Sequence, residues 1–126
     1  MPRRIIVGIS GSSGVIYGVR LLERLRQLGS HEVHVVVSET ADRTLAIETD
    51  RRADDLRKLS DVWHRNDNLA ASIASGSFQT EGMIIAPCSI KTLSGVANCY
   101  AGSLMVRAAD VCLKERRRLV DRKSVV

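Results

Sequence analysis

The feature that most constrains the fold is a set of short apolar segments that hardly alternate with polar residues. Arg4–Ile9, Glu32–Val37 and Gly82–Ala86 are rich in Ile, Val or Met along most of their length. A strand with one solvated face alternates apolar and polar residues, whereas a strand covered on both faces is apolar almost throughout. These segments therefore predict parallel strands in the middle layer of an α/β domain.

Helical patterns separate these strands along the chain. From Val15 to Leu28 apolar residues recur at helical spacing, and Gly29 follows where a helix C-terminal cap is expected. We predict further helices at 39–48, in part of 50–60, and at 70–74, 92–98 and 104–116, and further strands at 62–64 and 118–120. Strands that alternate with helices indicate a parallel sheet with right-handed crossovers, in a three-layer α/β/α arrangement.

Size and charge restrict the possible functions. The chain has 126 residues, which is enough for one domain. Its net charge of +5 is concentrated in residues 114–126, which carry six basic and two acidic side chains. The chain has one Phe, one Trp and two Tyr. A local basic segment with so few aromatic residues for base stacking argues against nucleic-acid binding.

The sequence also predicts where the protein works. No apolar run approaches the roughly 20 residues that a membrane helix needs, and Ile5–Val7 is too short for the core of a signal peptide. Cys88, Cys99 and Cys112 are too widely spaced for a zinc motif, and an odd number of cysteines argues for free thiols. We expect a cytoplasmic protein that binds neither a metal nor a membrane.

Three junctions between a strand and the next helix carry groups suited to an anion. They are the loop Gly8–Gly14, Ser38, and Pro87–Leu93. In an open α/β sheet such loops meet at the carboxyl edge, where backbone N–H groups and helix N-termini bind phosphates. Each also has a structural interpretation, because Gly and Ser favour tight turns and Ser38, Ser89 and Thr92 can cap helices. Their coincidence predicts a ligand with a phosphate and a planar part.

Several single residues have two interpretations. Cys88 has no base beside it in the sequence and is expected to be a buried small side chain rather than a nucleophile. His34 lies within a strand and is expected to be structural. Arg107 either pairs with Asp110 on its helix or contacts a ligand phosphate. Lys114, taken alone, is typical of a solvated helix surface.

Five motifs, in this order along the chain, resemble those of the flavin prenyltransferases of UbiX type. Many of these proteins are known as subunits of aromatic-acid decarboxylases. The motifs are Gly8–Gly14, Ala74–Phe78, Gly82–Leu93, Arg107–Val111 and Leu113–Arg117. The resemblance extends over residues 3–120, and the number and order of the motifs make it specific.

The resemblance implies a flavodoxin-like Rossmann fold and FMN as cofactor. It implies transfer of a dimethylallyl group from dimethylallyl phosphate to N5 and C6 of the flavin, without a metal. The prenylated FMN would serve a partner decarboxylase of ubiquinone synthesis or of phenolic acids, and the family forms homo-oligomers. Such a reaction needs cations and N–H groups around the leaving phosphate, and a π-face near the allylic cation.

The resemblance also implies roles for individual residues. Ser13 would lie near the reacting centre, and Lys114 would hold the prenyl phosphate, often across a subunit boundary. The expected FMN contacts are Gly11, Ser12, Ser13, Ser38, Ser89, Ile90, Lys91, Thr92 and Arg107.

The chain departs from the family pattern after Val120. Family members continue with an Arg-Glu-Thr-Pro segment and later with a Tyr and a basic residue that complete the site, whereas here the sequence reads Asp121–Val126. These residues match what a common sequencing-library adapter encodes in one reading frame. We therefore expect residues 1–120 to be a partial FMN-binding domain and residues 121–126 to be a tail foreign to the family.

The missing family segments have a physical consequence. An incomplete sheet leaves a strand edge and apolar faces uncovered. We expect these 126 residues alone to be poorly soluble or to bind FMN weakly, and to lack transferase activity.

Two other functions fit the same fold. FMN-dependent decarboxylases of cysteinyl peptides share it but usually carry a catalytic histidine, and none of the three histidines here lies in a comparable loop. An FMN-binding accessory subunit of a hydroxyaromatic-acid decarboxylase complex would need only the cofactor site.

Overall fold

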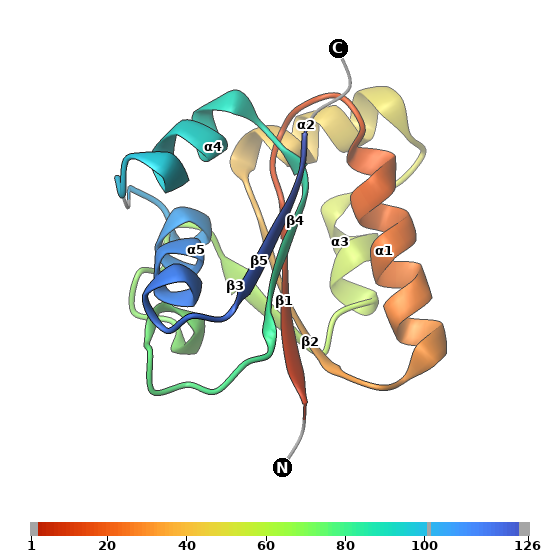
Figure 1. The fold of residues 1–126 in the computed structure, drawn as a ribbon. Coiled ribbons are helices and arrows are strands. Elements are labelled where there is room, and N and C mark those ends of the chain that lie inside the picture. The colour runs from red at the N-terminus through yellow and green to blue at the C-terminus, as the bar shows by residue number, and fades with distance from the viewer. Residues whose placement is uncertain (1–2, 101, 124–126) are drawn as a thin grey trace.

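A single sheet of five parallel strands organises the structure (Figure 1). It is seen in a computed structural model, which describes residues 3–100 and 102–123. The order β3-β2-β1-β4-β5 places a switch point between β1 and β4, where open α/β sheets bind ligands beyond their carboxyl ends. The predicted flavodoxin-like Rossmann sheet is confirmed. The strands are β1 (Arg4–Ile9), β2 (Glu32–Val37), β3 (Val62–Arg65), β4 (Gly82–Cys88) and β5 (Arg118–Lys123).

Helices lie on both faces of the sheet and give the three layers that the sequence predicts (Figure 1). One face carries α1 (Val15–Leu28), α2 (Glu39–Glu48) and α3 (Ala53–Lys58). The other face carries the 3₁₀ turn η1 (Ser72–Ala74), α4 (Ile90–Ala97) and α5 (Leu104–Lys114).

Strand β1 shows why its sequence lacks alternation. Val7 and Ile9 are buried in the cluster that includes α1, whereas Ile6 is buried in the cluster that includes α5. All three side chains are at most 2% exposed. Because both faces of the strand are covered, both sets of alternate residues are apolar.

The junction between β4 and α4 differs from the prediction. The strand continues through Pro87 to Cys88, and the helix begins at Ile90, two positions before the predicted start at 92. A proline is tolerated at this end of β4 because the ladder with β5 is irregular between Ile85 and Cys88. Pro87 has no N–H to donate, but its carbonyl oxygen accepts from the Ser10 backbone N–H at 3.2 Å.

Strand β5 also extends beyond the predicted 118–120. It continues to Lys123, with Asp121 opposite Ile85 of β4. The strand therefore runs into the segment 121–126 that we predict to be foreign to the family. Residues 124–126 of that segment lie outside the described residues.

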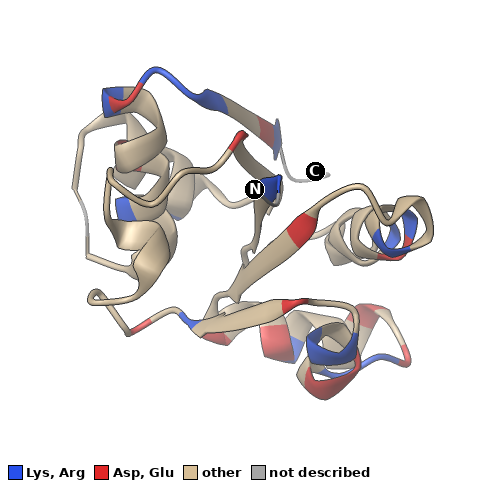
Figure 2. Cartoon of the chain, turned by 90° about the horizontal axis from the view of Figure 1, so that it is seen from below, with Lys and Arg blue, Asp and Glu red and all other residues tan. Residues whose placement is uncertain are grey.

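Basic residues follow the path from the end of α5 into β5 (Figure 2). This path includes Lys114, Arg116, Arg117 and Arg118. The excess positive charge of the chain thus lies away from the α2 and α3 side, where acidic residues are interspersed. Within the described residues, no helix is both long enough and apolar enough to cross a membrane.

The contact between α1 and β4 gives a first prediction. Gly18 of α1 is buried, and a Cβ atom there would collide with the backbone carbonyl oxygen of Ala86. Because that oxygen belongs to a buried strand, Gly18→Ala should lower the free energy of unfolding by about 1–3 kcal/mol, despite the better helix propensity of Ala. Urea denaturation measures the change.

A matched control is Gly102→Ala. A Cβ at Gly102 meets only Tyr100 at ordinary contact distance, so the free energy of unfolding should change by no more than about 0.5 kcal/mol. Equal midpoints for Gly18→Ala and the unchanged protein would contradict the tight packing of α1 on β4.

Candidate functional site

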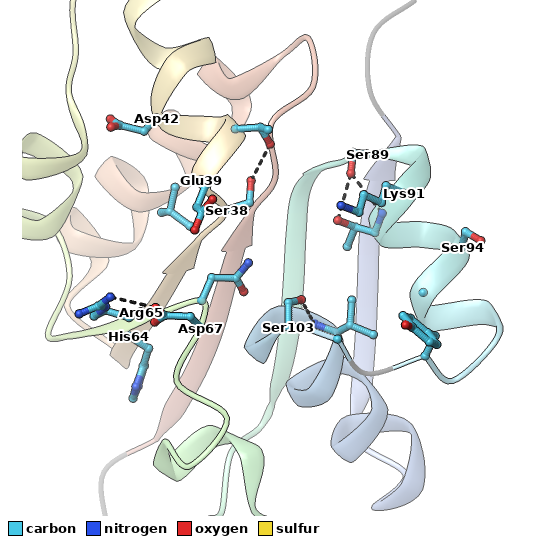
Figure 3. Close-up of a pocket in the computed structure, with 18 of the residues that line it drawn as sticks. Ser38, Glu39, Asp42, His64, Arg65, Asp67, Ser89, Lys91, Ser94 and Ser103 are labelled. Carbon is cyan, nitrogen blue, oxygen red and sulfur yellow. Dashed lines mark hydrogen bonds and ion pairs between the residues drawn. The ribbon is translucent and has the colours of Figure 1, made fainter.

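A cleft of about 1080 Å³ opens at the carboxyl edge of the sheet, between the β2–β3 side and the α4–α5 side (Figure 3). Four of the predicted site residues line it, namely Ser38, Ser89, Lys91 and Thr92. The cleft therefore brings together two of the three junctions that the sequence singles out. The other lining residues are Val37, Glu39, Thr40, Asp42, Ala53, Trp63, His64, Arg65, Asn66, Asp67, Ser94, Gly95, Asn98, Tyr100, Gly102, Ser103 and Val106.

Three helices begin at this cleft, and a serine caps each of them. The Ala41 N–H donates to Ser38 Oγ at the start of α2 at 3.3 Å. At the start of α4 the Thr92 N–H donates to Ser89 Oγ at 3.2 Å. Ser103 does the same for α5 (Figure 3). The capping interpretation of Ser38 and Ser89 is therefore correct, and the caps also bring three helix N-termini to the cleft.

The three N-termini differ in charge. The first turn of α2 contains Glu39 and Asp42, whose carboxylates offset the positive end of the helix dipole. The first turns of α4 and α5 contain no acidic residue. Lys91 adds a positive charge on the α4 side (Figure 3). An anion in the cleft is therefore favoured at α4 rather than at α2.

The Ser10 side chain ties the first loop to the end of β4. Ser10 is 1% exposed, and its Oγ donates to the Pro87 carbonyl oxygen at 2.7 Å. Ser10 Oγ also accepts from the Ser89 N–H at 2.7 Å. The loop after β1 and the loop after β4 are thus fixed to each other across the switch point.

The rest of this loop packs closely against α2. A Cβ at Gly11 would collide with Thr40 of α2, so only glycine fits there. Ser12 Oγ is buried and has no hydrogen-bond partner among the described residues. An unpaired buried hydroxyl costs about 1–3 kcal/mol, so a ligand that pairs with it gains affinity.

Glu48 supports the same loop and is not among the predicted residues. Its Oε1 accepts from the Gly14 N–H at 3.0 Å, and Gly14 has a φ of 99°, which favours glycine. Glu48 lies at the end of α2, far along the chain from the loop, so no local motif connects the two.

Six predicted residues lie outside the lining of the cleft, and two of them, Gly11 and Ser12, belong to the first loop. Ser13 is exposed on the first loop, and Ile90 is 72% exposed at the start of α4. Arg107 is exposed on α5. Lys114 ends α5, at the opposite end from Ser103, and its Nζ lies 3.9 Å from a carboxylate oxygen of Glu115. Since α5 has 11 residues and rises about 1.5 Å per residue, Lys114 does not reach the cleft of its own chain.

The loop after β3 supplies residues that the sequence reasoning missed. Asn66 accepts from two backbone N–H groups of α5, those of Leu104 at 2.8 Å and Met105 at 2.9 Å. Arg65 and Asp67 form an ion pair at 2.8 Å on the wall of the cleft. The sequence did contain a signal for these residues, because a run of polar residues directly follows β3, as polar residues follow the other strands whose ends form the cleft.

Cys88 behaves as the sequence predicts. It is 3% exposed, and burial, with a smaller effect of the Asp121 charge, raises the pKa of its thiol to about 11. A neutral buried thiol is a poor nucleophile. Its place beside the switch point therefore reflects packing.

The geometry fits a phosphorylated ligand with a planar part. Helix N-termini without acidic residues, a lysine, and hydroxyls at the carboxyl edge suit a phosphate. The unpaired Ser12 hydroxyl offers a polar contact to the remainder of such a ligand.

Comparisons with known proteins agree with this geometry. A family model described as Flavoprotein matches residues 1–120. The flavin prenyltransferase UbiX of Escherichia coli strain K12 is 58% identical over 118 residues, which are 94% of this chain and 62% of the relative. The sequence resemblance to flavin prenyltransferases is thereby confirmed.

Two solved structures share the fold closely. AnUbiX (PadA1), in complex with FMN and dimethylallyl pyrophosphate, superposes with a TM-score of 0.95 at 42% identity, over 98% of this chain and 65% of that chain. A dodecameric FMN-dependent UbiX-like decarboxylase from Escherichia coli O157:H7 also gives 0.95, at 46% identity over 98% and 66%. The chain thus spans slightly less than two thirds of the length of these proteins. Because the family model matches residues 1–120, the chain belongs to the Flavoprotein family.

Proposed function

We propose that the cleft binds FMN. The observation that carries this proposal is the meeting of the α4 and α5 N-termini with Lys91 in one cleft. The unpaired Ser12 hydroxyl lies on the loop after β1, which Ser10 ties to the end of β4. FMN has a phosphate that suits the helix N-termini and Lys91, and its ring edge has polar atoms that suit the Ser12 hydroxyl. The solved complex of AnUbiX with FMN supports the same ligand.

The phosphate and the flavin ring of the ligand have separate sets of contacts in this proposal. Ser89, Lys91 and Thr92 hold the phosphate at the start of α4, because acidic residues do not oppose an anion there. Ser38 contributes a hydroxyl from the opposite wall. Following the family resemblance, the flavin contacts are Gly11, Ser12, Ser13, Ile90 and Arg107.

We further propose that this flavin site serves prenyl transfer from dimethylallyl phosphate. The flavin supplies the nucleophilic ring atoms. The chain positions the flavin, with Ser13 near the reacting centre, and its oriented N–H groups favour anionic phosphate. Since Lys114 does not reach the cleft of its own chain, its contact with the prenyl phosphate requires a neighbouring subunit.

We also propose an oligomeric state, a partner enzyme and a cellular location. A homo-oligomer is supported by the dodecameric relative, and it would place Lys114 of one subunit against the cleft of another. The product would pass to a decarboxylase of aromatic acids that uses prenylated FMN. Cys88, Cys99 and Cys112 are free thiols, which supports the cytoplasmic location that the sequence predicts.

The phosphate assignment predicts the effect of Lys91→Gln. Loss of one charge-assisted contact worth roughly 1.5 kcal/mol should weaken FMN binding about tenfold. Binding of riboflavin, which lacks the phosphate, should change by less than about twofold. Flavin fluorescence titration measures both dissociation constants.

Lys58→Gln on α3 is the matched control, because Lys58 is exposed and does not line the cleft. It should leave both dissociation constants unchanged. If Lys91→Gln weakened FMN and riboflavin equally, the phosphate would not lie at α4. If neither flavin bound to the unchanged protein, the proposed function would be wrong.

The transferase proposal is best tested in a chimera, since the chain spans 62% of the length of its E. coli relative. Residues 1–120 followed by the remaining segment of E. coli UbiX should convert FMN and dimethylallyl phosphate to prenylated FMN. Oxidised and reduced FMN are supplied in separate assays. Ser13→Ala in this chimera should lower kcat about 100-fold. Mass spectrometry of the flavin gives the readout.

Ser30→Ala provides the control, because Ser30 is exposed beside His31, away from the cleft. It should leave kcat unchanged. A folded chimera that binds FMN but forms no prenylated product would favour the accessory FMN-binding role. An unchanged kcat in Ser13→Ala would remove Ser13 from the reacting centre.

A further inference from the structure

Two of the three histidines lie side by side inside the sheet. His34 on β2 is 2% exposed and His64 on β3 is 8% exposed. His34 Nδ1 and His64 Nε2 are 2.8 Å apart, and the ring centroids are 5.1 Å apart with 16° between the ring planes. A short nitrogen–nitrogen distance between nearly coplanar rings means that the rings meet edge to edge in a direct hydrogen bond.

A carboxylate holds the other edge of His34. His34 Nε2 lies 2.7 Å from Glu32 Oε1, and Arg4 Nε donates to the same oxygen at 3.2 Å. The hydrogen bond from His34 is the main reason why the pKa of Glu32 lies below its ordinary value. An ionised carboxylate can only accept, so Nε2 of His34 carries a proton and its Nδ1 edge faces His64.

The hydrogen bond between the two rings has room for one proton. It persists when the pair is neutral, and also when the pair carries a single positive charge that Glu32 offsets. It breaks when both rings are imidazolium, because each ring then presents an N–H to the other. Burial, reinforced by the charge of His34, lowers the pKa of His64.

The groups packed around the pair offer no second counter-charge. The Phe78 ring packs edge-on against His34 at 5.3 Å between centroids, and Arg4 lies over the same ring. Arg117 approaches from this side as well, because it donates to the Phe78 carbonyl oxygen at 3.0 Å. Both charged groups beside Phe78 are therefore positive.

The remaining neighbours are neutral or already paired. The buried residues of α5 are apolar apart from Cys112, and burial raises the pKa of its thiol. On β3 the next charged residue is Arg65, which is paired with Asp67. A second proton on the histidine pair would thus enter surroundings that already contain more positive than negative groups.

The pair is connected to the cleft through β3. His64 itself lines the cleft, and two residues later Asn66 accepts from the N–H groups of Leu104 and Met105 at the start of α5. Strand β3 is at the edge of the sheet and pairs only with β2 among the described strands. A break between His34 and His64 therefore loosens the strand that holds the α5 N-terminus in place.

We propose that the buried His34–His64 pair, with the half-buried Glu32 at its outer edge, is a proton-operated latch of the cleft. With at most one extra proton the latch joins β3 to β2 and keeps Asn66 clamped on α5. With both rings protonated it opens, and the cleft loses its ligand-binding shape. The structural part stands on the histidine geometry alone, whereas the effect on FMN rests on the proposed function.

The direction of the pH effect follows from the lowered pKa of His64. In the folded protein His64 binds its proton less readily than in the unfolded chain. Its contribution to stability is therefore fully present above the ordinary histidine pKa of about 6.5 and is lost as the pH falls through the folded pKa. The latch is closed at neutral pH and opens in acid.

The first test uses the unchanged protein without any ligand. Ring NMR should show that the histidine pair takes up its second proton only below the ordinary histidine pKa of about 6.5, as the lowered pKa of His64 requires. In the same acid range the Leu104 and Met105 amides should lose hydrogen-exchange protection before the amides of β1. If both rings titrated together near the ordinary value and the α5 amides kept their protection, the latch would be refuted.

The second test compares His64→Gln with His31→Gln. A glutamine can bond to His34 but cannot be protonated, whereas His31 is the histidine near Glu81, away from the cleft. Between about pH 7.5 and 5.5, FMN binding to the unchanged protein and to His31→Gln should weaken about tenfold more than binding to His64→Gln. The FMN phosphate, with a pKa near about 6, contributes equally to all three.

The outcomes of the two tests are separable. Equal pH dependence in all three proteins would overturn the link between the latch and the cleft. If FMN bound to none of them at any pH, the proposed function would fail, and ring NMR with hydrogen exchange would still decide on the latch. Should His64→Gln fail to fold, the titration of the unchanged protein gives the decision.

Discussion

The Ser10 hydroxyl is the contact on which the site depends. It donates to the Pro87 carbonyl oxygen and accepts from the Ser89 N–H, both at 2.7 Å. These bonds join the ends of β1 and β4, the two strands between which the chain reverses its order in the sheet. Because Ser10 is buried, loss of either partner would leave a polar group unpaired at a cost of about 1–3 kcal/mol.

The helix N-termini follow from this contact. Once β1 and β4 are fixed, the first loop packs under Thr40 of α2, and Ser89 is held where it begins α4. Asn66 brings the start of α5 to the same edge. The acidic first turn of α2 then leaves α4 and α5 as the ends that favour an anion.

Local patterns predicted much of the fold. The strands at Arg4–Ile9 and Glu32–Val37 have the predicted bounds, because apolar runs between loops are decided by nearby residues. The helix at Val15–Leu28 and its Gly29 cap are equally local. The end of β4 was placed too early, since Pro87 is accommodated by its partners in β1 and β5 rather than by its own sequence.

Part of the site was predictable because it too depends on local sequence and on strand order. Ser38, Ser89, Lys91 and Thr92 follow strands directly, and topology alone brings them to one edge. Glu48 and the histidine pair depend on contacts between residues that are distant in the sequence, at separations of 34 and 30 positions. Such contacts have no local signal. Lys114 stays a prediction that concerns a second subunit.

The central claim is that the start of α4 receives the phosphate of FMN, and an amide NMR titration tests it most directly. On addition of FMN, the backbone amides of Lys91 and Thr92 should show the largest shifts, and riboflavin should shift them much less. Inorganic phosphate should shift the same amides at higher concentration. Shifts from FMN that concentrate near Ala41 of α2, or at the opposite edge of the sheet near His31, would contradict the account.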